Sequence, residues 1–171
     1  MQIDVDVENT LKDLDLISLT LRNKAQKILK ELIISGYTVA DYAFADAEYD
    51  GTNDVSLSMK FEGNTAELIA SGKSVLFIEF GSGIVFTDEN PKAAELGFIR
   101  GTYGKGNGAN LSWLYVGEAG TNGYVVDEKK NGDTVVRTQG NPPANAMYEA
   151  SKVMRDKVVS TVWEVLFGDK H

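Results

Sequence analysis

Apolar residues recur every three or four positions from Asn9 to about Ser35, which is the spacing of one helix face. Asn9 is a suitable N-cap, and Gly36 stands where a left-handed residue commonly ends a helix. The pattern predicts a helix about 40 Å long that lies on a core, with a shorter helical stretch after it. The apolar face of the long helix contains Leu14, Ile17, Leu21, Ala25, Ile28 and Leu32, and the shorter stretch contains Val39, Tyr42 and Ala43.

The segments that follow have the pattern of strands. "DVSLSMKF" (54–61) alternates apolar and polar residues, which is typical of a half-buried strand. Glu62-Gly63-Asn64 forms a turn, after which "TAELIAS" (65–71) returns as the partner strand. "LSWLYVG" (111–117) and "DTVVRTQG" (133–140) are predicted as further strands. Because residues 81–140 hold 12 of the 17 glycines, this region is expected to be rich in loops.

The C-terminal segment predicts a second long helix. Asn141-Pro142-Pro143 is a helix-start signal, because proline fits the first turn, and Gly168 is suited to end the helix. Two helices that bracket a run of strands indicate an α+β fold. We expect one domain over residues 1–171, with a single antiparallel or mixed sheet of about four strands. The two helices would cover one face of this sheet. The apolar face of the second helix contains Met147, Ala150, Met154, Val158, Val162 and Val165.

Composition narrows the classes of function. A net charge of −8 repels phosphate backbones and disfavours tight nucleic-acid binding. With no cysteine in the chain, disulfides, thiolate nucleophiles and zinc–sulfur sites are excluded. No apolar run approaches the ~20 residues that span a bilayer, so no membrane partner is expected.

The glycine-rich stretch "GTYGKGNGAN" (101–110) raises the question of a phosphate-binding loop. A P-loop requires four residues between its first glycine and Gly-Lys-Ser/Thr, whereas Gly106 follows Lys105 here. A dinucleotide fingerprint requires a helix next, whereas the following residues, with Trp113 and Tyr115, predict a strand. Nucleotide binding is therefore disfavoured, and no cofactor is expected.

Two other patterns suggest chemistry. "DAEYDGTND" (46–54) imitates the first positions of an EF-hand calcium loop, but Leu57 stands where the bidentate glutamate is needed. A turn at Asp50-Gly51 is the preferred interpretation, and a small calcium-binding module remains an alternative. The only histidine is the last residue, His171, so no histidine-based triad can be assembled. Glu79 is flanked by apolar residues, which leaves a hydrolase that uses Glu79 as a second alternative.

Four segments in a fixed order resemble a known family. They are "YDGTNDVSLSMKFEGN", "VLFIEFGSG", "GTYGKGNGANLSWLYVG" and "TQGNPPANAMYEASKVM". In this order they resemble the small neck proteins of long-tailed bacteriophages, the tail-completion or head–tail joining proteins. The most specific elements are residues 77–83 (FIEFGSG) and 140–144 (GNPPA). Ser82 stands where threonine is commoner in the family, and Pro142-Pro143 doubles a proline that is usually single.

The resemblance implies a non-enzymatic virion protein of the neck, assembled in the bacterial cytoplasm. It would form a ring, typically a hexamer, between head-closure or connector proteins and the tail tube protein, or serve as another minor tail or head-closure component. DNA would pass through the ring without specific binding. Glycine-rich loops become ordered on binding, so residues of the loop and of "FIEFGSG" are expected at the assembly interface. These interface residues are Glu79, Phe80, Gly101, Gly104, Lys105, Gly106, Gly108 and Trp113.

Overall fold

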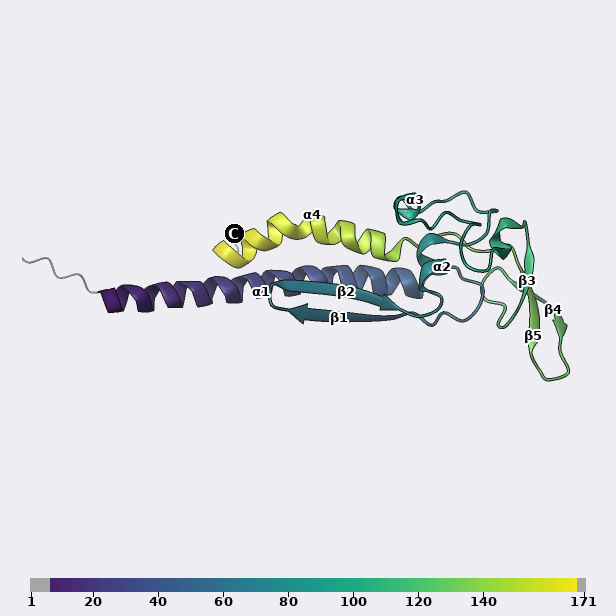
Figure 1. Ribbon diagram of the computed structural model, residues 1–171, viewed down its shortest axis with the longest axis horizontal. Helices are drawn as coiled ribbons and strands as arrows, with labels where there is room; N and C mark the ends of the chain where they lie inside the picture. The colour runs from purple at the N-terminus through teal and green to yellow at the C-terminus, as the bar shows by residue number, and fades with distance from the viewer. Residues whose placement is uncertain (1–6, 169–171) are drawn as a thin grey trace, which may run out of the picture.

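The computed structural model describes residues 7–168 as an elongated molecule built along one long helix (Figure 1). This helix, α1, spans Val7–Ala45, so it continues past Gly36 instead of ending there. The predicted shorter helical stretch is the last part of the same helix. His171, which the sequence excluded from catalysis, lies outside the described residues.

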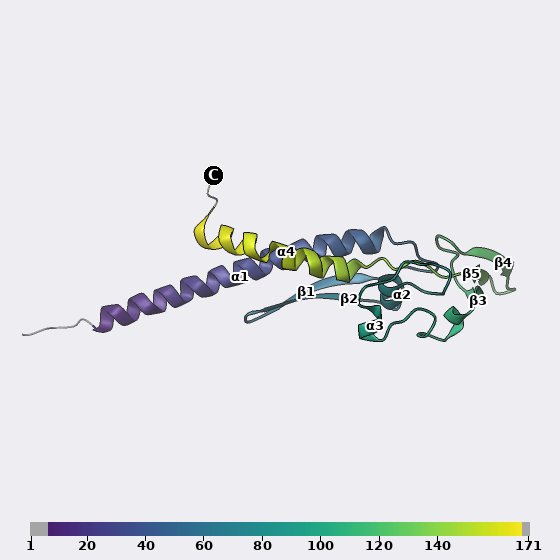
Figure 2. The same ribbon diagram turned by 90° about the horizontal axis from the view of Figure 1, so that it is seen from above.

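Gly36 is explained by helix packing. It is buried against α4, which spans Ala146–Phe167, and a Cβ atom at Gly36 would lie 2.7 Å from the Sδ atom of Met154. The absence of a side chain at Gly36 therefore lets the two helices approach closely, and the prediction that Gly36 ends α1 is wrong. The helices run antiparallel (Figures 1 and 2).

Helix α4 begins later than the Asn141-Pro142-Pro143 signal predicts. Asn141 pairs with Ser82 in an isolated antiparallel bridge, which keeps the proline segment outside the helix. The predicted end is confirmed: Gly168 follows Phe167 with φ 76° and donates its N–H to the carbonyl of Glu164 at 2.8 Å.

The predicted hairpin is confirmed. Strands β1 (Ser56–Glu62) and β2 (Thr65–Ser71) pair antiparallel from Ser56–Ser71 to Glu62–Thr65, with the turn between them. Leu57 and Leu68 pack against the buried cluster that α1 and α4 share. The hairpin thus covers one side of α1, with its polar face in solvent.

A second sheet lies at the end of the molecule far from the start of α1 (Figures 1 and 2). Its strands β3 (Trp113–Val116), β5 (Thr134–Thr138) and β4 (Tyr124–Glu128) are antiparallel, with β5 in the centre. The α+β class is confirmed, but the strands form two sheets where one was predicted. The hairpin packs Leu57 and Leu68 toward α1 but leaves Met59 and Phe61 39% and 51% exposed, while the second sheet lies beyond the helices. Strand β4, which the sequence did not predict, is exposed throughout and has no alternation of apolar and polar residues.

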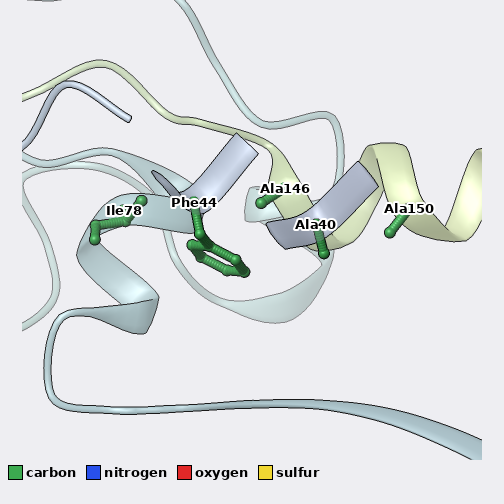
Figure 3. Close-up of a cluster of buried hydrophobic side chains, with 5 residues drawn as sticks. All are labelled: Ala40, Phe44, Ile78, Ala146 and Ala150. Atoms are coloured by element: carbon green, nitrogen blue, oxygen red, sulfur yellow. The ribbon is translucent and has the colours of Figure 1, made fainter. Parts of the chain in front are cut away.

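Short helices fill the region between the sheets. "VLFIEF" forms α2 (Val75–Phe80), and α3 (Ala93–Leu96) and a 3₁₀ turn (Asn107–Ala109) follow. Helix α2 contributes Ile78 to a buried cluster that joins three helices (Figure 3). None of the helices in the described part of the chain is both long and apolar enough to cross a bilayer. The cluster consists of Ala40, Phe44, Ile78, Ala146 and Ala150.

Candidate assembly site

The carboxylate of Glu79 occupies the N-terminus of α4. Its oxygens accept hydrogen bonds from the backbone N–H of Met147 at 2.8 Å, from that of Tyr148 at 3.1 Å and from the side-chain amide of Asn90 at 3.0 Å. The first N–H groups of a helix have no partner within the helix, and an anion is favoured at that end. Glu79 is only 5% exposed, so it acts as a cap supplied from α2 and not as a surface residue.

Burial and hydrogen bonding act on the pKa of Glu79 in opposite directions. Burial disfavours the charged carboxylate and raises the pKa above its ordinary value. The N–H donors of Met147 and Tyr148 and the amide of Asn90 favour the charged form and limit the rise. A carboxylate whose oxygens are occupied by the backbone of its own chain is suited to hold α4 in place.

The two most specific segments of the sequence meet at this point. The N–H of Ser82 donates to the carbonyl of Asn141 at 2.9 Å, and the N–H of Asn141 returns to the carbonyl of Ser82 at 3.1 Å. The side chain of Asn141 donates to the carbonyl of Phe77 at 2.9 Å, and Ala144 donates its N–H to the carbonyl of Ile78 at 2.8 Å. Residues 77–83 and 140–148 therefore form one hydrogen-bonded unit, which we call the motif junction.

Asn145 adopts a strained backbone conformation inside the motif junction. Its φ of 55° and ψ of 26° lie in the left-handed region. Among the described residues, it is the one residue other than glycine with a positive φ. The side chain does not cap α4, and its Oδ1 atom is buried without a hydrogen-bond partner in the structure. The conformation gives the chain a sharp turn into α4, at a position where asparagine is tolerated better than most residues.

We expect Asn145→Gly to change the free energy of unfolding by less than about 0.5 kcal/mol. Glycine relieves the left-handed strain and the buried oxygen, but it loses more backbone entropy on folding. Asn145→Ala should destabilise the chain by about 1 kcal/mol, because alanine keeps the strain. Urea denaturation of both variants measures the difference. Equal stability of the alanine and glycine variants would contradict the role of the backbone angle.

The glycine-rich loop is packed on α2 by aromatic rings. Phe77 stacks on Tyr103 with ring centroids 5.6 Å apart, and Phe80 stacks on Phe98 at 4.6 Å. The hydroxyl of Tyr103 donates to the carbonyl of Gly81. Gly104 has φ of 73°, and a Cβ atom there would lie 3.0 Å from the ring of Phe77. The glycine thus serves both a left-handed turn and close contact with an aromatic side chain.

A cleft of about 650 Å³ lies between this loop and β3. The structure brings four of the predicted interface residues to its wall: Gly101, Lys105, Gly108 and Trp113. Gly104 contacts Phe77, and Gly106 has open space around it. Glu79 and Phe80 do not line the cleft; both are buried within the subunit. Other residues of the wall include Tyr49, Asp50, Phe77, Tyr103, Tyr115 and Glu118.

Two acidic residues of the segment that imitates a calcium loop, Asp50 and Asp54, accept hydrogen bonds from different parts of the chain. Asp50 accepts the N–H groups of Asn122 at 2.6 Å and Gly123 at 2.7 Å, together with the hydroxyl of Thr138. Asp54 accepts the N–H groups of Lys73 and Ser74, both at 2.9 Å. The hydrogen bond from the Ser74 hydroxyl, with those from the backbone, lowers the pKa of Asp54 to about 2. Asp50 thereby links the segment that follows α1 to the second sheet, and Asp54 holds the start of α2.

Sequence reasoning missed the exposure of the first part of α1. Helix α4 ends beside Lys24, whose Nζ atom donates to the carbonyl of Leu166 at 2.9 Å. Every residue from 11 to 23 is exposed, and this segment extends past α4 in both views (Figures 1 and 2). We call residues 11–23 the overhang. It carries six large apolar side chains, each more than half exposed: Leu11, Leu14, Leu16, Ile17, Leu19 and Leu21.

A second exposed apolar surface lies on α4. Val159, Trp163 and Phe167 are 79%, 57% and 58% exposed, and the rings of Trp163 and Phe167 lie 4.4 Å apart. Their spacing of four residues could have revealed this stripe in the sequence. The role of Asn90, by contrast, gave no signal in the sequence, because its partner Glu79 lies 11 residues away in another element. Comparisons with protein-family models, curated proteins and solved structures each return no match for this chain.

Proposed function

We propose that this chain is a structural subunit of the phage neck, a tail-completion or head–tail joining protein that assembles as a ring. The ring, with six subunits as the expected number, would lie between head-closure or connector proteins and the tail tube protein. In this proposal the protein is not an enzyme, needs no cofactor and is localised in the virion after assembly in the bacterial cytoplasm. The proposal starts from the resemblance of the four sequence segments to the neck family.

The overhang is the observation that supports the proposal most directly. Six large apolar side chains lie more than half exposed within residues 11–21, and no described residue of the chain covers them. Exposed apolar surface costs roughly 25 cal/mol per Å² relative to burial, and contiguous exposed patches mark interaction sites. A subunit that acts within an assembly covers such a helix with its neighbour.

The motif junction supports the same function in another way. Its hydrogen bonds tie α2, the proline segment and α4 into one unit, and the cleft adjoins it, with Phe77 and Ser82 in the wall. Such a subunit keeps its shape in the middle and offers surfaces at both ends for contact with other proteins. Glu79 then serves the fold, and Lys105 and Trp113 at the cleft remain proposed interface residues.

The charge of the chain suits a channel through which DNA passes. With a net charge of −8, the subunit repels the phosphate backbone, so DNA would move through the ring without being held. This part of the proposal concerns the whole chain and not a particular surface.

Particles that carry an epitope-tagged copy of this chain provide the test. Immunogold electron microscopy should place the label at the head–tail junction, and tails made without the chain should fail to join heads. Restoring the untagged chain is the control. Label on the connector side of the junction would favour a head-closure component, and particles that form and infect normally without the chain would overturn the proposal.

A further inference from the structure

The overhang is the continuation of the α1 face that packs on α4. Ala25, Ile28 and Leu32 of this face are partly buried, in the stretch of α1 between its contacts with α4 at Lys24 and Gly36. The same stripe continues through Leu21, Ile17 and Leu14, each 55–56% exposed. Helix α4 does not cover this part of the stripe, because α4 ends at Phe167 beside Lys24. The overhang therefore presents, over about 20 Å of helix, the type of surface that elsewhere in the molecule binds a helix.

The outer stripe of α4 is a helix surface without a partner among the described residues. At 100° per residue, Val159 and Trp163 lie about 160° and Phe167 about 120° from the buried Thr161, which shares its face of α4 with Met154, the residue against Gly36 of α1. The stripe thus points away from the α1 of its own chain. Tryptophan is among the residues that most often anchor an interface, and phenylalanine is enriched at interfaces.

The two surfaces cannot cover each other within one chain. The overhang lies beyond the end of α4, whereas the outer stripe lies on the back of α4. If one of these surfaces binds the other on a second copy, the contact is head-to-tail and either closes as a ring or grows as a filament. A contact between two overhangs would leave the α4 stripe uncovered.

Charge and area allow a second copy to bind. The overhang carries two basic residues, Lys12 and Arg22, and two acidic residues, Asp13 and Asp15, so its own charge is zero despite the −8 of the chain. Each apolar stripe is of the order of the ~300–600 Å² that marks the largest functional patch on a monomer. A contact of this size lies below the ~1,200–2,000 Å² that stable specific interfaces bury, so one such contact alone is expected to be weak and reversible.

We infer that the overhang of one subunit packs its Leu14–Ile17–Leu21 stripe on the Val159–Trp163–Phe167 stripe of the next copy. The contact is helix on helix, with Trp163 as its central anchor. The inference rests on the proposed function only for the closure of the chain of contacts into a ring; the contact itself needs no other phage protein.

Cysteine cross-linking of two differently tagged chains tests the contact. The sequence has no cysteine, so Ile17→Cys in one chain and Val159→Cys in the other introduce the only thiols. With a short bismaleimide linker, the mixture should yield cross-linked pairs that neither variant forms alone. Cross-linking of Ile17→Cys with itself would show an isologous contact between overhangs and would overturn the inference. A wild-type chain that stays monomeric up to millimolar concentration would also overturn it.

Paired substitutions in the overhang provide the matched control. Leu21 and Leu19 are both 56% exposed, but Leu19 lies on the other side of α1. In sedimentation velocity, Leu21→Glu and Trp163→Ala should each weaken self-association at least about tenfold, as expected for anchor residues. Leu19→Glu should change it less than about threefold, the scale of a peripheral contact. Equal loss with Leu19→Glu and Leu21→Glu would contradict the stripe. Circular dichroism verifies that each variant keeps its helices.

The two proposals fail in distinguishable ways. Cross-linked head-to-tail oligomers of a chain that is absent from particles would leave this inference in place and remove the proposed function. A chain that is found at the neck but gives no cross-link between Ile17→Cys and Val159→Cys would do the reverse.

Discussion

Glu79→Ala is expected to destabilise the chain by about 3 kcal/mol or more, because a buried donor left without its partner costs roughly 1–3 kcal/mol. The substitution leaves the N–H groups of Met147 and Tyr148 and the amide of Asn90 without their acceptor. A loss of this size is a large part of the ~5–15 kcal/mol by which domains are stable. Chemical denaturation at neutral pH measures it, with far-ultraviolet circular dichroism as the probe.

Glu79→Gln separates the charge from the shape of the side chain. Glutamine keeps one acceptor oxygen but turns an NH₂ group toward a backbone N–H, so we expect a loss between those of wild type and Glu79→Ala. Glu67→Gln on the exposed β2 strand is the control and should be nearly neutral. A Glu79→Gln variant as stable as the wild type would contradict the capping role.

The raised pKa of Glu79 also predicts a pH dependence. Between the ordinary value of 4.5 and the higher value in the folded state, the folded chain holds more protons at Glu79 than the unfolded chain does. The contribution of Glu79 to stability is therefore fully present below pH 4.5 and falls as the pH rises through its folded pKa. The difference in unfolding free energy between wild type and Glu79→Gln should shrink over this window.

Gly140→Ala is expected to cost about 3 kcal/mol, part of it from left-handed strain and part from crowding. Gly140 has φ of 93°, and a Cβ atom there would lie 2.1 Å from the carbonyl oxygen of Ser82. That carbonyl accepts the N–H of Asn141, so the substitution separates the two segments of the motif junction.

Gly106→Ala isolates the strain from the crowding. Gly106 has φ of 76°, but nothing lies within 4 Å of the position of its Cβ atom. We expect a loss of about 1 kcal/mol from the backbone angle alone. Thermal unfolding of both variants measures the difference, and similar melting temperatures would show that the close approach at Gly140 relaxes without cost.

The fold class and the local elements could be predicted from the sequence because their signals are local. The alternation in 54–61 and the turn after Glu62 predict the hairpin, and Gly168 marks the end of α4. The prediction that Gly36 ends the helix was wrong, because a glycine at a helix contact and a glycine at a helix end look the same in a sequence. Only the position of Met154 distinguishes them. The short strand β4 has neither burial nor alternation, so its pairing with β5 is a tertiary effect.

The candidate site was predictable only in part. The apolar flanks of Glu79 correctly singled it out as unusual, but the donors it meets lie 68 and 69 residues away. The segments 77–83 and 140–144 stood out as specific, whereas their direct pairing depends on the path of the chain between them. The overhang was predicted as part of a core-facing helix, since periodicity shows which face is apolar but not what covers it.

The glycine at the α1–α4 crossing also gives the molecule a geometric property. Leu14 lies 22 residues before Gly36 on an uninterrupted helix, a lever about 33 Å long, so a tilt of about 10° at the crossing moves Leu14 by about 6 Å. A larger side chain at position 36 would push against Met154 and change that tilt. In an assembly built through the proposed overhang contact, the angle between neighbouring subunits would therefore depend on Gly36, the one residue of α1 that has no side chain.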